Sequence, residues 1–191
     1  MRMTNRAKLL FAVGGATMLA SLCMNAAAAP ATFVLSSSTF KDGTLMPPRV
    51  ALHNPPNCGG EDISPQLSWS NAPDGTKSFA LTMVSEEGQG GLGEPLLVVY
   101  GVSAGVTSFA EGELSRASDK FVGGKNIHGL GTYDGPCHGA GSSHHYIFKV
   151  IATDLDPKAL APGLTLPELQ AELQGHARGV AGLVGLFTKS Q

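Results

Sequence analysis

The sequence contains no run of basic residues and no apolar stretch long enough to be a membrane span. Lys and Arg number 13 against 15 Asp and Glu in 191 residues, for a formal net charge of −2. A chain without a basic run lacks the surface that nucleic acids and anionic membranes require. Its apolar run over residues 9–23 is shorter than the roughly 20 residues that a spanning helix needs.

Motifs for catalysis and cofactor binding are also missing. No serine stands in a GxSxG elbow, and the serines beside His144 are only neighbours in sequence. Four histidines fall within residues 128–145, but no two have the i, i+4 spacing of helical zinc ligands. Residues 88–93 (GQGGLG) fit a dinucleotide-binding spacing, yet Pro95 and a strand-like run follow instead of a helix. We therefore expect no catalytic residue, no metal and no cofactor, with a hydrolase as a remote alternative.

Residues 1–29 have the layout of a secretory signal peptide. Three basic residues precede the apolar run, and four alanines precede Pro30. We expect cleavage there and a periplasmic or secreted protein; retention as a membrane anchor, or as a lipoprotein through Cys23, is less favoured. Residues 30–191 then keep ten basic against fifteen acidic side chains, a net charge of about −5.

Residues 30–191 are sufficient for one domain with a sizeable core. Of the three cysteines, only Cys58 and Cys137 follow the signal peptide. An even pair in an exported protein predicts a disulfide. Two separate buried thiols are the alternative, because sequence alone does not show that the pair lies close.

Short runs of β-branched and aromatic residues separated by Asp-Gly, Pro and Gly turns indicate a β-sandwich or barrel. Closely spaced prolines exclude a helix between residues 47 and 56. One short helix is expected after Thr165, where a capping box precedes leucines at helical spacing that end before Gly175. Strands are expected over residues 32–36, 67–70, 79–84, 96–102, 146–152 and 180–187.

Residues 133–148 form the candidate site. They combine a turn, a glycine-rich loop and adjacent histidines, and they lead directly into a strand-like alternation. Loops held by a rigid scaffold often carry binding groups. Adjacent His144 and His145 would point to opposite faces of a strand, so at most one can join a given site. His145 is then a surface residue, and His138 is expected to be free to move.

These residues resemble a known family. GPC at 135–137 and HHYIF at 144–148 are similar to the second signature of the phosphatidylethanolamine-binding proteins, which include bacterial Raf-kinase-inhibitor-like proteins. The resemblance implies a mainly β fold, a Greek-key β-sandwich with a few short peripheral helices. It extends over nearly the whole chain after residue 31, through residues 40–43 (FKDG), 60–65 (GEDISP), 67–69 (LSW), 72–82 (APDGTKSFALT) and 175–176 (GH).

The resemblance also implies a small pocket for anionic groups such as phosphate, phospholipid headgroups or acetate. His144, Pro136 and Tyr146 match the family's loop histidine, loop proline and following aromatic residue. His145 stands where arginine is usual, which weakens the local positive charge at neutral pH. His144, Pro136 and Tyr146 are therefore candidate ligand-binding residues.

The opposite wall of the implied pocket departs from the family. Where the family has Asp-Pro-Asp, this chain has Ser85 and keeps a carboxylate at Glu87, and Leu96 replaces a pocket histidine. Each lost charge-assisted hydrogen bond costs about 1.5–3 kcal/mol of anion affinity, so two losses exceed about a hundredfold. We expect Ser85, Glu87 and Leu96 to line a pocket that binds phosphate weakly or not at all.

Function by resemblance is ligand binding or regulation, not catalysis. The expected partner is a small anionic or neutral organic ligand. The alternative is inhibition of, or interaction with, another exported protein such as a protease, through the acidic surface and residues 88–93. Nucleic acid is not an expected partner, and pairing of two copies as a homodimer is left open.

Overall fold

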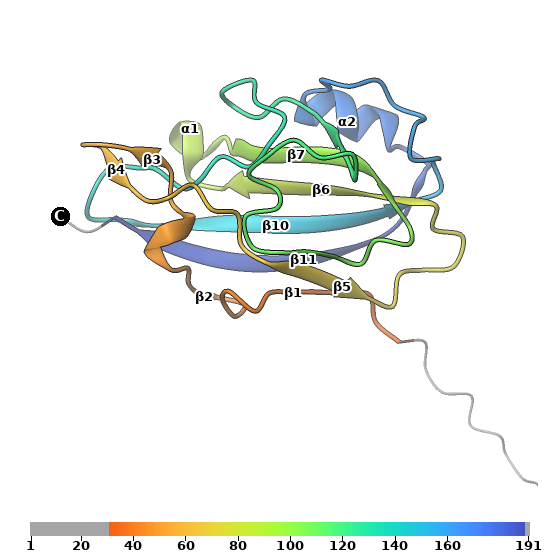
Figure 1. Ribbon diagram of the computed structural model, residues 1–191, viewed down its shortest axis with the longest axis horizontal. Helices are drawn as coiled ribbons and strands as arrows, with labels where there is room; N and C mark the ends of the chain where they lie inside the picture. The colour runs from red at the N-terminus through yellow and green to blue at the C-terminus, as the bar shows by residue number, and fades with distance from the viewer. Residues whose placement is uncertain (1–30, 190–191) are drawn as a thin grey trace, which may run out of the picture. The chain divides into compact units, whose positions relative to one another are not determined.

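The computed structural model describes residues 31–189, so the predicted signal peptide lies outside the described residues. The fold is mainly β, as expected (Figure 1). A six-stranded sheet has the order β2-β11-β10-β6-β7-β9, and a three-stranded sheet has the order β1-β5-β8. The strands are β1 (Val34–Ser36), β2 (Thr44–Leu45), β3 (His53–Asn54), β4 (Cys58–Gly59), β5 (Leu67–Ser70), β6 (Ser78–Ser85), β7 (Glu94–Ser103), β8 (Ser108–Phe109), β9 (Val122–Gly123), β10 (Ser143–Thr153) and β11 (Ala177–Thr188).

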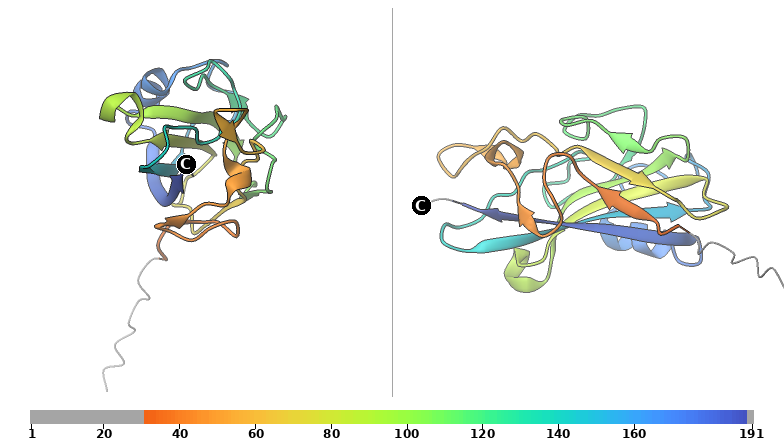
Figure 2. Two further views of the ribbon diagram at one scale, coloured as in Figure 1. Left: turned by 90° about the vertical axis from the view of Figure 1, so that its left-hand side faces the viewer. Right: turned by 90° about the horizontal axis from the view of Figure 1, so that it is seen from below.

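All six predicted strands are present, within a few residues of their expected bounds. In the larger sheet β6, β7, β10 and β11 pair antiparallel, and only β2 runs parallel to its neighbour β11. The long strands lie side by side in both views of Figure 2. The Greek-key order of the strands stays a prediction.

The main core lies between the two sheets. Alternate residues of β10, namely Tyr146, Phe148 and Val150, are buried in it because successive side chains of a strand face opposite ways. From the smaller sheet, Trp69 packs its ring 5.3 Å from that of Phe79, measured between centroids. Burial of these large apolar side chains is the dominant stabilising contribution.

The predicted helix is confirmed as α2 (Leu166–Glu172), which covers the other face of the larger sheet (Figure 1). The Glu168 carboxylate accepts hydrogen bonds from the backbone N–H and the hydroxyl of Thr165, both at 2.8 Å. Leu169 and Leu173 pack in a second core with residues of β6 and β7. The capping box starts the helix, and its leucines hold it on the sheet.

The expectation of no helix among the closely spaced prolines is wrong for one turn. A 3₁₀ helix, η1, spans Pro48–Val50. Pro48 occupies the first turn, where its missing N–H would be unpaired in any case and its fixed φ suits a helix. The glycine-rich connection between β6 and β7 forms the short turn α1 (Gly88–Gly91), where Gln89 and Gly90 have φ of 52° and 72°. This connection closes the hairpin between β6 and β7.

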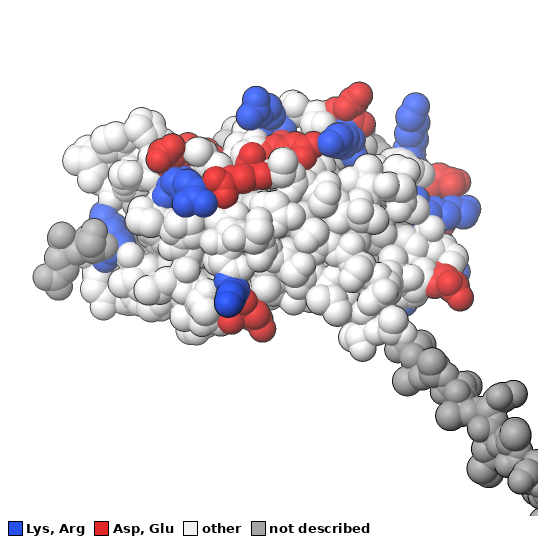
Figure 3. All heavy atoms as spheres, turned by 60° about the horizontal axis from the view of Figure 1, so that its bottom comes forward, with Lys and Arg blue, Asp and Glu red and all other residues white. Residues whose placement is uncertain are grey.

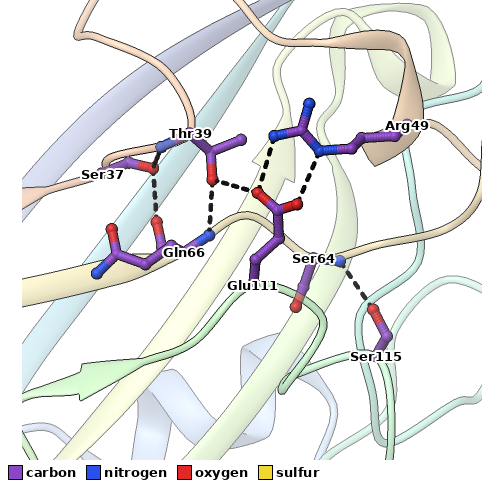
Figure 4. Close-up of polar contacts among 7 residues, drawn as sticks. All are labelled: Ser37, Thr39, Arg49, Ser64, Gln66, Glu111 and Ser115. Atoms are coloured by element: carbon purple, nitrogen blue, oxygen red, sulfur yellow. Dashed lines mark hydrogen bonds and ion pairs between the residues drawn. The ribbon is translucent and has the colours of Figure 1, made fainter.

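A polar network joins η1 to the loop after β8 (Figure 4). The Arg49 guanidinium donates to both carboxylate oxygens of Glu111, at 2.7 and 2.9 Å. The Thr39 hydroxyl donates to the same carboxylate at 2.9 Å and accepts from the Gln66 N–H at 3.0 Å. The hydrogen bond from Arg49 is the main reason that the pKa of Glu111 lies below its ordinary value. Burial acts in the opposite direction and offsets this shift only in part. The bidentate pair fixes the segment that carries residues 48–52.

On the face in Figure 3, charged residues of both signs alternate along one border and a broad uncharged area lies beside them. No helix within residues 31–189 is long and apolar enough to cross a membrane.

Candidate functional site

A small pocket lies at the end of the larger sheet where β10 and β7 begin and β6 ends. Tyr146 pairs with Ser85, and Ser85 pairs with Glu94, so one row across three strands forms its floor. His144 also lines this pocket, which we call the His144 pocket. Its cavity volume is about 40 Å³. That is room for a few waters or a small polar group, since one water needs roughly 10–15 Å³ measured in this way.

Four of the six residues predicted to bind a ligand line this pocket, namely Ser85, Leu96, His144 and Tyr146. The other two do not. The carbonyl of Pro136 accepts the Leu52 N–H at 3.1 Å, which places this proline in the support of the pocket loop. The backbone and ring of His145 bond to the Glu87 carboxylate, so Glu87 serves the neighbouring surface pair.

The loop that carries Pro136 is held close to residues 50–52. Gly135 donates its N–H to the Asp62 carboxylate at 2.7 Å, and the Tyr133 hydroxyl donates to the Val50 carbonyl at 2.9 Å. Burial raises the pKa of Asp62, although the Gly135 N–H acts in the opposite direction. A Cβ on Gly135 would lie 2.4 Å from the Leu52 nitrogen. Only glycine permits this approach, and the approach closes one side of the pocket.

The predicted disulfide between Cys58 and Cys137 is confirmed, with an S–S distance of 2.01 Å and Cα atoms 5.8 Å apart. Cys137 lines the His144 pocket. The bridge therefore ties the pocket loop to strand β4.

His138 is not a freely moving loop residue, which corrects the expectation from sequence. Its ring stacks on that of His144, with centroids 3.9 Å apart and planes at 10°. Its Nδ1 lies 2.7 Å from the Gly139 carbonyl oxygen, and its Nε2 lies 3.1 Å from that of Phe187. The last strand, β11, supplies the Phe187 contact, which is distant in sequence and so could not be anticipated.

His144 and His145 point to opposite sides, as expected from their strand positions. His144 faces the pocket, whereas the side chain of His145 is 53% exposed. Burial, followed by the neighbouring His138, lowers the pKa of His144 below its ordinary value. At neutral pH the His144 ring is therefore uncharged and donates from one nitrogen only.

The floor of the pocket holds two hydroxyls. Burial raises the pKa of Tyr146 far above its usual value, and a hydrogen bond with the Ser85 side chain offsets this only in part. Ser85 is 1% exposed. No serine hydroxyl within residues 31–189 is hydrogen-bonded to a histidine ring, which is the contact that a serine nucleophile requires.

Sequence reasoning missed a histidine and two carboxylates in this pocket. His128 bonds through Nδ1 to the carboxylate of Asp134, which is only 2% exposed. The Asp134 N–H donates to the Leu96 carbonyl at 3.0 Å, and Glu94 lines the same cavity. Leu96 stands where the family resemblance implies a histidine, but His128 reaches the pocket from the loop after β9. A carboxylate directly before the GPC motif was the one available signal.

These groups can bind a small polar ligand by hydrogen bonds. The rings of His128 and His144 and the hydroxyls of Ser85 and Tyr146 supply donors and acceptors, whereas both ring nitrogens of His138 are engaged by backbone carbonyls. Two leucines, Leu52 and Leu96, give the cavity an apolar side. No cluster of three or more side chains able to hold a metal ion occurs within the described part of the chain.

Comparison with known proteins gives consistent matches. A family model described as phosphatidylethanolamine-binding protein matches residues 36–188. A UPF0098 protein of Aquifex aeolicus is 30% identical over 181 residues, which cover 90% of this chain and 99% of that relative. The crystal structure of Escherichia coli YbcL, described as a new member of the mammalian PEBP family, superposes with a TM-score of 0.76 and 26% identity. It covers 84% of this chain and 100% of that one. A putative phosphatidylethanolamine-binding protein homologue, CT736 of Chlamydia trachomatis, superposes with a TM-score of 0.71 and 29% identity, over 83% and 98% of the chains. None of these names describes an enzyme.

Proposed function

This chain belongs to the phosphatidylethanolamine-binding protein family, and we propose that it is an exported, non-enzymatic binding protein for a small organic ligand. The His144 pocket is the binding site. Its ligand is neutral or weakly charged, and phosphate binds poorly. Export to the periplasm or secretion is supported by the signal-like layout of residues 1–29 and by the disulfide, a bond that persists in oxidising compartments.

The observation that carries this proposal is the charge of the pocket walls. Glu94 and Asp134 are both among the residues that line the cavity, and Leu96 stands where the family resemblance implies a histidine. A phosphate oxygen about 5 Å from one carboxylate would be repelled by roughly 3 kcal/mol per pair of unit charges at an effective dielectric constant of 20. His128 offsets the charge of Asp134 only when it is protonated. A neutral ligand avoids this repulsion and can use the same hydrogen bonds.

Calorimetry at pH 7.5 with phosphate and phosphoethanolamine tests the anion part of the proposal. The parent protein is expected to bind both more weakly than about 1 mM. A Leu96→His variant, which returns this position to the family pattern and adds a hydrogen-bond donor without a further carboxylate, is expected to gain affinity by about tenfold or more. Millimolar or tighter phosphate binding by the parent, abolished by His144→Ala, would refute the proposal.

Native mass spectrometry of protein purified from the exported fraction tests the ligand part. We expect a retained organic molecule that is lost from His144→Ala, because this substitution removes a donor from the cavity. Leu92→Ala is a suitable control, since Leu92 is 86% exposed and lies outside the pocket. An empty pocket, together with no binding across lipid and metabolite panels, counts against the proposal.

A second candidate function is interaction with another exported protein, such as inhibition of a protease. It is favoured by Leu92, whose side chain is 86% exposed at the glycine-rich connection between β6 and β7. Burial of an exposed large apolar side chain against a partner removes apolar area from water and so favours association. Crosslinking in the exported fraction should then capture a partner with the parent protein and not with Leu92→Asp. Equal capture by both, or no specific capture, contradicts this function.

A further inference from the structure

A second and larger pocket lies on the other side of residues 51–52 from the His144 pocket. It is lined by Pro48, Ala51, Cys58, Phe187, Thr188 and Lys189 and by the backbone of residues 59–60. Its cavity volume is about 160 Å³, four times that of the His144 pocket. We call it the Phe187 pocket.

The two pockets share no lining residue, and residues 51–52 form part of the wall between them. Ala51 lines the Phe187 pocket, and the next residue, Leu52, lines the His144 pocket. The disulfide crosses the same wall, with Cys58 on one side and Cys137 on the other. The Phe187 ring meets the His138 ring edge to face at 5.8 Å and completes the division. A ligand in one pocket therefore does not occupy the other.

The size and the walls of the Phe187 pocket suit an aromatic ring. An enclosed apolar cavity of about 150 Å³ binds benzene. The Phe187 pocket is open to solvent on one side and has the polar backbone of residues 59–60 in its lining, but its volume is sufficient for one ring. Phe187 is 8% exposed and Ala51 is 3% exposed, so the interior surface that they offer is apolar and held by the core. A ring packed against Phe187 would gain an aromatic contact in addition to the burial of apolar area.

The rim of the Phe187 pocket carries one cation. Lys189 lies beside the exposed hydroxyl-bearing Thr188, and within residues 31–189 no carboxylate lies at ion-pair distance from it. Arg49, by contrast, is already paired, because its Nε and one of its Nη atoms donate to the Glu111 carboxylate (Figure 4). A single ammonium at the mouth of an apolar cavity matches a ligand with one negative charge at the end of an apolar body.

We propose that the Phe187 pocket binds small aromatic monocarboxylates, with the ring against Phe187 and the carboxylate at Lys189. This site is distinct from the His144 pocket and does not depend on the function proposed for it. The chemistry needs both parts of the ligand: the ring fills the cavity, and the carboxylate forms a charge-assisted hydrogen bond.

Benzoate is the probe for this proposal, with the full chain and isothermal calorimetry or ligand-observed NMR as the measurement. Benzamide, which lacks the charge, and acetate, which lacks the ring, are each expected to bind about tenfold or more weakly than benzoate. Lys189→Gln is expected to weaken benzoate binding by about tenfold or more. Lys158→Gln, the same substitution at an exposed lysine elsewhere, is expected to change it by less than about twofold. Thermal unfolding of both variants establishes that they remain folded.

Further variants separate this site from the other pocket. Phe187→Leu keeps an apolar side chain of similar size, so it should reduce the preference for benzoate over cyclohexanecarboxylate. Ser85→Ala alters the His144 pocket at a position outside the ring contacts that join His144, through His138, to Phe187, and it is expected to leave benzoate affinity unchanged. The proposal is overturned by no benzoate binding at about 10 mM, by equal binding to the parent and Lys189→Gln, or by loss of benzoate binding in Ser85→Ala.

Discussion

Removing the disulfide should cost this domain a large part of its stability. Cys58 and Cys137 are 79 residues apart in sequence, so their bond closes a long loop in the unfolded chain. In the chain-entropy treatment a loop of that length corresponds to about 4.5 kcal/mol at 25 °C. For a domain of this size, the loss would lower Tm by about 10–18 °C. The expected effect is large because the bond restricts the unfolded state, whatever other contacts hold the folded loop.

The assay is urea unfolding of the parent and of the Cys58→Ser, Cys137→Ser double variant, followed by fluorescence of the single tryptophan, Trp69. The parent under a strong reductant is a second route to the same state. If the bond acts on the unfolded chain, the midpoint should fall and the m-value should rise, because the unbridged chain exposes more surface. A loss below about 1 kcal/mol with an unchanged m-value would refute the reasoning. The residual loop contacts, Leu52 with Pro136 and Gly135 with Asp62, would then account for the loop's position.

Three further predictions concern local packing and protonation. Gly135→Ala should lower the free energy of unfolding by about 1–3 kcal/mol, because the added Cβ would lie 2.4 Å from the Leu52 nitrogen. Gly139→Ala is the control and should be nearly neutral, because its Cβ would meet nothing within 4 Å. Equal effects of the two substitutions in urea unfolding would contradict this prediction. Leu169→Ala, at a fully buried position on the inner face of α2, should lower the free energy of unfolding by about 2–5 kcal/mol. A loss as small as that of Leu92→Ala would show that α2 adds little to stability. Because the pKa of His144 is lowered on folding, the unfolded chain takes up a proton first as pH falls through about 6.5, so stability should decline there; His144→Gln should show a shallower decline, and identical pH profiles would exclude this source.

The strands and the helix followed from local patterns, and the site did so only in part. Alternating residues such as Leu67 and Trp69 predict a half-buried strand, and the Thr165 capping box predicts a helix. Both patterns could be read from the sequence because each depends only on residues a few positions apart. His144 and Ser85 were placed in one pocket through the family resemblance. The pair of His128 and Asp134 had no such signal, since it depends on how one loop folds back on the start of β7.

The same limit explains the correction at His138. His138 is held by the carbonyl of Phe187 on the last strand, 49 positions along the chain, and no local pattern predicts a contact of that range. The 3₁₀ turn at Pro48 was missed for a different reason: the rule against proline in helices concerns their interior, and a single turn consists only of ends.

The position of β11 has a consequence for how the protein is made. The strand occupies residues Ala177–Thr188, yet it lies inside the larger sheet between β2 and β10. While these residues are not yet synthesised, the whole length of β10 is an open edge with unpaired backbone groups, a form prone to pair with other chains. The sheet cannot close until β11 has been synthesised and has paired with β10. A chain that has β10 but lacks β11 is therefore expected to aggregate more readily than the chain that has both.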